Sequence, residues 1–250
     1  MTLEYDGARY AGWQRQENAL TIQQEVEDAL YKVAGQRIAV HASGRTDRAV
    51  HALGQVAHFD TELRMAPDKF AYALNVFLPR DIRVLESRWA SDDFHARFDA
   101  KGKLYRYCIH NAPHASAIHR NTRLHIYRSL DLSAMGEAAA MVVGIHDFAA
   151  FCAAGSQVRS TVRSISRSEW RRAGVLIEYE IAGSGFLYNM VRILVGTMLE
   201  IGLGRRSVES MREALSGRER ALAGPTAPPH GLALVQVFYG DNVGETLRNT

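Results

Sequence analysis

Hydrophobic positions in the first hundred residues switch between period two and helical spacing, which predicts an alternation of strands and helices. Thr21 and Gln24 form a capping box, and the apolar positions that follow recur at helical spacing until Gly35. A second helix is expected to open at Pro67 and to close before Pro79. Strands are predicted at residues 3–5, 37–42, 55–59 and 82–89. The resulting order of strand, helix, strand, strand, helix and strand is that of a split β-α-β unit.

The second half of the chain repeats this theme less regularly. Strands are predicted at residues 104–109, 175–181 and 232–239, and helices at 133–143, from Phe186 onward and at 208–215. No long Gly/Ser-rich or Pro-rich linker interrupts the chain, so the two halves are expected to share a continuous sheet. The prediction is an α+β fold with an N-terminal domain at residues 1–99 and a C-terminal domain at residues 100–250.

Composition places the chain among ordinary globular proteins. Hydrophobic residues make up 47% and charged residues 23% of the 250 positions, which argues against disorder. The longest apolar stretch, residues 186–203, contains Asn189, Arg192 and Glu200, so no membrane span is expected. The first residues lack a basic region followed by an apolar block, which favours the cytoplasm. The two cysteines are too few for a disulfide framework.

The basic residues are unevenly chosen and unevenly placed. The net charge is only +3, yet 26 of the 30 cationic residues are arginine, the side chain best suited to bind phosphate with two hydrogen bonds. A GC-rich genome would produce the same bias. Position favours the functional interpretation, because residues 97–106, 119–128 and 159–172 interleave basic, aromatic and hydroxyl side chains. A polyanionic partner is therefore indicated.

The most unusual chemistry lies in a polar loop at residues 43–48, Ser-Gly-Arg-Thr-Asp-Arg. Its single carboxylate, Asp47, stands between Arg45 and Arg48. A nearby cation lowers the pKa of a carboxylate and keeps it ionised, which suits a nucleophile or a general base. An aspartate in a glycine-containing turn also commonly caps its own backbone, and composition alone does not choose between these roles.

Other kinds of site are weakly supported. His41, His51 and His58 are close in sequence, but their spacing matches no metal-binding motif. Ser43, His51 and Asp47 could form a hydrolytic triad, although no nucleophile elbow accompanies them. Neither a Walker loop nor a dinucleotide-binding loop is present. We therefore expect no metal and no cofactor.

Several motifs, taken together, resemble one family along the whole chain. The loop Gly44-Arg45-Thr46-Asp47, with the following Val50-His51-Ala52 and Gly54-Gln55-Val56, resembles the catalytic-aspartate motif of the tRNA pseudouridine synthase A (TruA) family. Similar matches occur at residues 4–16, 93–98, 103–107, 144–151, 185–192 and 227–234.

The resemblance implies a pseudouridine synthase fold, with a mixed, mainly antiparallel sheet and helices on one face. It implies a homodimer without metal or organic cofactor, which isomerises uridine at positions 38, 39 and 40 of the tRNA anticodon stem-loop. Asp47 would be the catalytic group, and Arg192 would pair with it. Arg45 would fill the place of the extruded base or hold its phosphate. The resemblance makes Tyr105 the residue that contacts the base.

Three further residues follow from the motif or from their position beside it. Arg48 adds a third cation near Asp47, which is expected either to strengthen phosphate binding or to crowd the pocket. Phe186 and Leu187 are expected either to line the pocket or to belong to the core. The family usually has Ala-Gly where this chain has Arg48-Ala49. An alanine there would strain a backbone of positive φ by roughly 1 kcal/mol.

Two alternatives stay open at this stage. The same fold could bind RNA without catalysis, as a catalytically weakened paralogue, using arginine and tyrosine on its sheet. Asp47 argues against this, because a carboxylate in a basic groove weakens phosphate binding. A hydrolase based on His51 and Asp47 has no other support in the sequence.

Overall fold

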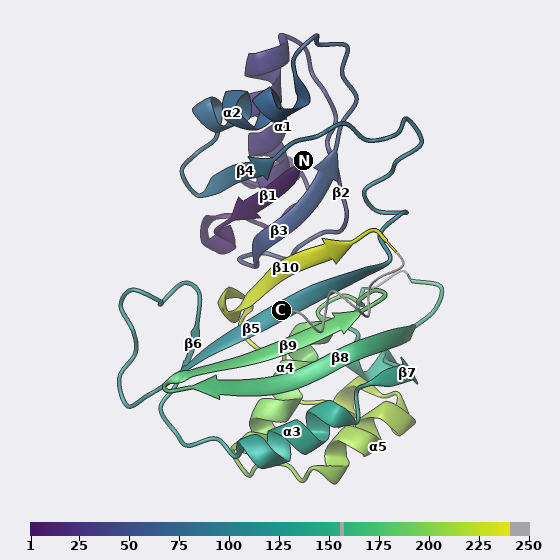
Figure 1. Ribbon diagram of the computed structural model, residues 1–250. Coiled ribbons are helices and arrows are strands. Elements are labelled where there is room, and N and C mark those ends of the chain that lie inside the picture. The colour runs from purple at the N-terminus through teal and green to yellow at the C-terminus, as the bar shows by residue number, and fades with distance from the viewer. Residues whose placement is uncertain (156–157, 241–250) are drawn as a thin grey trace. The chain divides into compact units, whose positions relative to one another are not determined.

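The computed structural model describes residues 1–155 and 158–240, and within them the chain forms two compact units (Figure 1). One unit contains Met1–Lys101 together with residues 233–240, and the other contains Gly102–Leu232. Each unit has its own strands and its own helices.

The first unit is a mixed sheet with two helices. The strands are β1 (Thr2–Tyr5), β2 (His41–Ala42), β3 (His51–His58), β4 (Ile82–Glu86) and β10 (Leu232–Phe238), and the helices are α1 (Ile22–Ala34) and α2 (Pro67–Phe77). Four strands lie in the order β4-β1-β3-β10. Strand β1 is antiparallel to both of its neighbours, and β10 is parallel to β3. Strand β10, the last strand within the described residues, therefore pairs into the sheet that carries the N-terminus.

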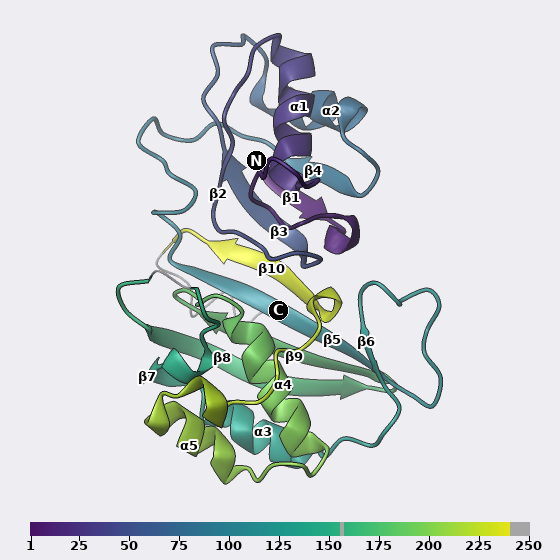
Figure 2. The ribbon, with the colours of Figure 1, turned by 180° about the vertical axis from the view of Figure 1, so that it is seen from behind.

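The second unit is an antiparallel sheet with three helices. Its strands are β5 (Gly102–Asn111), β6 (Leu124–Ile126), β7 (Gly144–Asp147), β8 (Val162–Ala173) and β9 (Leu176–Gly183), and its helices are α3 (Leu132–Ala140), α4 (Met190–Gly202) and α5 (Glu209–Gly217). The order is β5-β9-β8-β7, with β6 parallel to the far end of β5. Figure 2 shows α4 lying across one face of this sheet. Eleven of the thirteen residues of α4 are buried, as expected for a core helix.

Local signals placed most helices correctly. Thr21 caps α1 by accepting a hydrogen bond from the backbone of Gln24, and Gly35 ends it at φ +71°. Pro67 begins α2 as predicted. The strand–helix alternation and the α+β class are likewise confirmed, and the strands predicted at residues 3–5, 104–109 and 232–239 are found as β1, β5 and β10.

Several predicted boundaries differ from the structure, and strand β8 (Val162–Ala173) was not predicted. The strand expected at residues 37–42 is reduced to β2, because the backbone of Val40 donates to the carboxylate of Glu27 instead of to a strand. Strand β3 begins at His51, earlier than the predicted residue 55. The helix expected from Phe186 begins at Met190, since Asn189 takes the left-handed conformation. Strand β8 escaped prediction because its exposed face is rich in arginine and serine.

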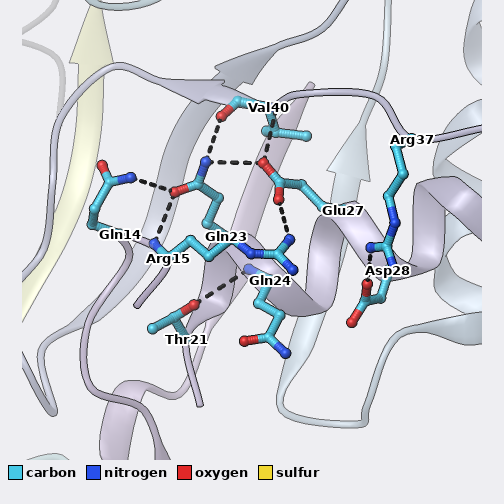
Figure 3. Close-up of polar contacts among 9 residues, drawn as sticks. All are labelled: Gln14, Arg15, Thr21, Gln23, Gln24, Glu27, Asp28, Arg37 and Val40. Atoms are coloured by element: carbon cyan, nitrogen blue, oxygen red, sulfur yellow. Dashed lines mark hydrogen bonds and ion pairs between the residues drawn. The ribbon is translucent and has the colours of Figure 1, made fainter. Parts of the chain in front are cut away.

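Polar contacts fasten the segment before α1 to the helix itself (Figure 3). The Gln23 side chain accepts hydrogen bonds from Gln14 Nε2 and from the backbone of Arg15, both at 2.9 Å. Glu27, only 8% exposed, accepts from Gln23 and Val40 and forms an ion pair with Arg15 at 2.7 Å. A buried carboxylate is stable only with such partners. This network fixes the position of residues 12–15, of which Gly12 and Trp13 contact the loop at residues 43–49.

Candidate active site

The candidate catalytic loop, residues 43–49, joins β2 to β3 in the first unit. Arg45 and Arg48 are exposed, Asp47 is partly exposed, and Thr46 is buried. The three charged residues singled out from the sequence thus share one short loop, with both guanidinium groups open to solvent. A carboxylate held there can meet an anionic substrate that the arginines attract.

Side chains of strands β1 and β3 hydrogen-bond to this loop. Tyr5 on β1 hydrogen-bonds to Thr46 Oγ1 at 2.8 Å, and Ser43 Oγ donates to Gln55 Oε1 at 2.7 Å. Gln55 Nε2 in turn donates to the carbonyl of Gly44 at 2.8 Å. Burial raises the pKa of Tyr5 to about 12, so its hydroxyl keeps its proton at neutral pH. The loop is therefore held by hydrogen bonds from neutral side chains.

The segment before α1 also holds the loop, through backbone hydrogen bonds. Trp13 donates its backbone N–H to the carbonyl of Thr46 at 3.0 Å, and Ala49 donates to the carbonyl of Tyr10 at 3.2 Å. Gly12 has φ +103°, and a Cβ there would lie 2.6 Å from the same carbonyl of Thr46. Only glycine allows the two backbones to approach this closely. Asp47 is consequently part of a rigid loop.

The departure at Ala49 has the structural consequence that the sequence suggested. Ala49 has φ +60°, one of only three positive values among the non-glycine residues that the structure describes. The loop thus keeps a left-handed conformation with an alanine in it. The cost is roughly 1 kcal/mol relative to glycine, and the hydrogen bonds around the loop offset it.

The remaining predicted site residues lie in the second unit. Tyr105 is on β5 opposite Ile181 of β9, and only 8% of its surface is exposed. Its ring meets that of Phe186 edge to face, with centroids 5.1 Å apart. Leu187 is 5% exposed, which makes it a member of the core. The structure therefore brings Tyr105 and Phe186 together.

Arg192 lies in the first turn of α4 and is partly buried. Its Nε donates to the carbonyl of Ala227 at 2.8 Å, and its Nη1 donates to Asn189 Oδ1 at 2.7 Å. The backbone of Ala227 also donates to the carbonyl of Arg192. The loop before β10 and the turn before α4 thus fix the position of this guanidinium group.

The histidines near the loop have structural partners. His51 is 6% exposed, accepts a hydrogen bond from the backbone of Gly7 at 3.0 Å and lies 3.1 Å from Asp6. The rings of His41 and His58 stack with centroids 5.2 Å apart. Across residues 1–155 and 158–240, no group of three or more histidine, cysteine or acidic side chains has the arrangement of a metal site.

Sequence reasoning missed the residues that support the catalytic loop. Tyr5, Tyr10 and Trp13 are each 2% exposed and belong to segments far from residue 47 in the chain. Their burial is typical of aromatic residues, so composition does not distinguish a supporting role. The available signal was the motif at residues 4–16, which matched the family as a whole.

Comparison with known proteins agrees with the fold and the loop. A family model described as tRNA pseudouridine synthase matches residues 1–99 and 138–240, so the chain is an RNA-modifying isomerase. It is 48% identical over 240 residues to tRNA pseudouridine synthase A of Ruminiclostridium cellulolyticum, covering 96% of this chain and 98% of the relative. It is 49% identical over 239 residues to the protein of the same name from Shouchella clausii, covering 95% and 92% respectively. The chain belongs to the tRNA pseudouridine synthase A (TruA) family, which confirms the resemblance.

The described helices also bear on the membrane question. None of those within residues 1–155 and 158–240 combines the length and the apolar character that a bilayer crossing demands.

Proposed function

We propose that this tRNA pseudouridine synthase acts on uridines 38, 39 and 40 of the anticodon stem-loop, with Asp47 as its catalytic group. The observation that carries the proposal is the rigid loop that holds one carboxylate between two exposed arginines. The names of the relatives and the motif around Asp47 support the same assignment.

The reaction explains why one carboxylate is enough. Isomerisation breaks the bond between the sugar and the base nitrogen and joins the same base through carbon, so no atom is gained or lost. An ionised Asp47 would either attack as a nucleophile or remove a sugar proton to give a glycal. Both routes require a carboxylate that is charged at neutral pH.

The other site residues would prepare the substrate. The target base is stacked in the RNA, so it must turn out into a pocket at a cost of a few kcal/mol. Tyr105 would contact the extruded base, with Phe186 beside it, and Arg45 would fill the vacated space or bind the phosphate. Arg48 would add to phosphate binding.

Arg192 would pair with Asp47 and keep it ionised. Its two hydrogen bonds, to Ala227 and Asn189, support this role, because they hold the guanidinium group at a fixed place in the first turn of α4. If Arg192 stabilises the charged carboxylate, Arg192→Gln will move the acid limb of the kcat/KM profile to higher pH. An acid limb that stays in place would refute the pairing.

The central experiment maps pseudouridine in an unmodified tRNA with uridine at positions 38, 39 and 40. Wild type, Asp47→Asn and Asp92→Asn are compared; Asp92 is exposed and lies outside the catalytic loop, so it controls for loss of charge. We expect modification by the wild type and the control alone. If Asp47→Asn retains the activity, the catalytic assignment is wrong. If the wild type binds the RNA without modifying it, the RNA-binding paralogue is the better interpretation.

The proposal also includes a homodimer that works in the cytoplasm. The family resemblance supports the dimer, and the tRNA named as substrate in the relatives' names supports the location. Sedimentation of the full chain with and without tRNA tests the oligomeric state, and a concentration-independent monomer would overturn it.

A further inference from the structure

A second cationic site lies in the second unit, where the chain leaves β5 and returns in β6. A cavity of about 120 Å³ opens there. Its polar lining is mainly basic: His110, His119, Arg120, Arg123, His125 and His230. No carboxylate occurs among the described residues that line it. We call these six residues the His–Arg pocket.

The loop that forms the pocket is held in place by its own contacts. His110 on β5 and His125 on β6 are direct partners in the parallel pairing of the two strands. His125 Nε2 hydrogen-bonds to the carbonyl of Ala112 at 2.8 Å, and His110 Nε2 hydrogen-bonds to the carbonyl of His114 at 3.2 Å. Arg120 donates to the carbonyl of Ala117 at 2.8 Å. The two ends of the loop are therefore anchored beside the cavity.

His110 has a buried polar atom that the protein does not satisfy. Its Nε2 must donate to the carbonyl of His114, because a carbonyl can only accept. Its Nδ1 is buried and has no hydrogen-bond partner. A neutral ring offers a lone pair there, suited to a hydroxyl group, and a protonated ring offers an N–H, suited to an anion. An unsatisfied buried group in a native structure calls for an explanation, and a ligand supplies one.

The charge of the pocket defines the ligand class. The lining contributes two guanidinium groups and the ring nitrogens of four histidines, and no carboxylate occurs among its described residues, so the site favours an anion. A volume of about 120 Å³ compares with roughly 30 Å³ for one water, so a phosphate group fits. RNA presents a phosphate and a 2′-hydroxyl on each nucleotide, matching both the cations and Nδ1 of His110.

We propose that the His–Arg pocket binds a phosphate–ribose step of the tRNA backbone, as a contact separate from the catalytic loop. The inference rests on the proposed function for its choice of RNA as the ligand. Five of the six residues lie between residues 100 and 137, outside the segments that the family model matches. The pocket is therefore a feature of this chain that the family match does not describe.

The test compares Arg120→Gln and the double variant Arg120→Gln/Arg123→Gln with Arg212→Gln. Arg212 is exposed on α5, lies outside the three basic segments and does not line the pocket, so its replacement removes the same charge from the same unit. The binding of fluorescent full-length tRNA to the full chain is measured by anisotropy between about 50 and 300 mM salt, a range over which phosphate-dependent binding weakens steeply. Thermal unfolding of each variant confirms that it is folded.

We expect Kd to rise about 5-fold for the single variant and about 10- to 100-fold for the double variant, with KM following. The slope of log K against log salt should become shallower by about 0.9 for each phosphate that the variant no longer neutralises. Arg212→Gln, which loses only a surface ion pair with Glu209, should stay within about 3-fold of the wild type. If the double variant fails to fold, Arg120→Gln alone decides, since Arg120 lies on the loop and is partly open to solvent.

Three outcomes would overturn the proposal: an unchanged Kd and salt slope in the pocket variants, an equal weakening in Arg212→Gln, or stabilisation by inorganic phosphate without any effect on RNA binding. The last outcome would indicate a small phosphorylated ligand. Failure of the proposed function looks different, because wild-type protein would then leave U38, U39 and U40 unmodified whatever the pocket variants do.

Discussion

Replacing Gly12 with alanine tests whether close backbone packing holds the catalytic aspartate in place. Gly12 has φ +103°, and an added Cβ would lie 2.6 Å from the carbonyl oxygen of Thr46 and 3.1 Å from the carbonyl carbon of Asp47. The same Thr46 oxygen accepts the hydrogen bond from Trp13. The new methyl group would therefore push directly on the loop that carries Asp47.

The magnitude follows from two separate effects. An L-residue forced to positive φ costs about 1–2 kcal/mol. Ordinary van der Waals contact begins at 3.4 Å, so the Thr46 oxygen must also move away by 0.8 Å, the difference from 2.6 Å. This oxygen belongs to the peptide unit that leads into Asp47. A displacement of about 1 Å at a reacting group can lower the rate about 100-fold, so we expect kcat/KM to fall about 10- to 100-fold.

Gly35 provides a matched control in the same unit. It has φ +71° at the end of α1, and no heavy atom lies within 4 Å of an added Cβ. Gly35→Ala shares the backbone cost without the collision. It should lower Tm by about 2–8 °C while leaving the catalytic rate within about 2-fold of the wild type.

The assay is single-turnover pseudouridine formation with enzyme in excess over unmodified tRNA, alongside thermal unfolding of each variant. Folded Gly12→Ala that reacts within about 3-fold of Gly35→Ala would show that the loop does not need this close approach. The reasoning about Asp47 would then be refuted, even if both proteins lost equal stability.

Two further predictions concern backbone strain and pH. Ala49→Gly should stabilise the protein by about 0.5–1 kcal/mol, because glycine adopts positive φ without strain. Ala90→Gly, at an exposed loop position without positive φ, should destabilise it. If the urea midpoints of the two variants move in the same direction, the prediction is wrong. Burial, followed by the charges of His95 and His41, lowers the pKa of His58. The unfolded chain then binds a proton at His58 more readily than the folded chain, so the free energy of unfolding decreases as the pH falls below about 6.5. His58→Gln should make this decrease smaller between about pH 7 and 5. If urea unfolding gives the variant and the wild type the same dependence of unfolding free energy on pH, this prediction is wrong.

Some features of this protein follow from sequence alone because their causes are local. The start of α1 needs only the Thr21 hydroxyl and the nearby Gln24 backbone, and its end needs only a glycine. The strained position at residue 49 was also expected, since a motif that usually has glycine there has alanine here. The family resemblance likewise depends on short motifs that can be read directly.

Other features depend on contacts between distant parts of the chain. The support of Asp47 comes from Tyr5, Tyr10 and Trp13, and periodicity does not reveal which buried aromatic residue meets which loop. The parallel pairing of β10 with β3 brings residues 233–234 beside residues 51–52, far away in the sequence. Residues 37–40 have strand propensity, yet Glu27 takes the hydrogen bond that a sheet would have used. Sequence thus determined the local elements, and only tertiary packing decided which of them hold the catalytic loop.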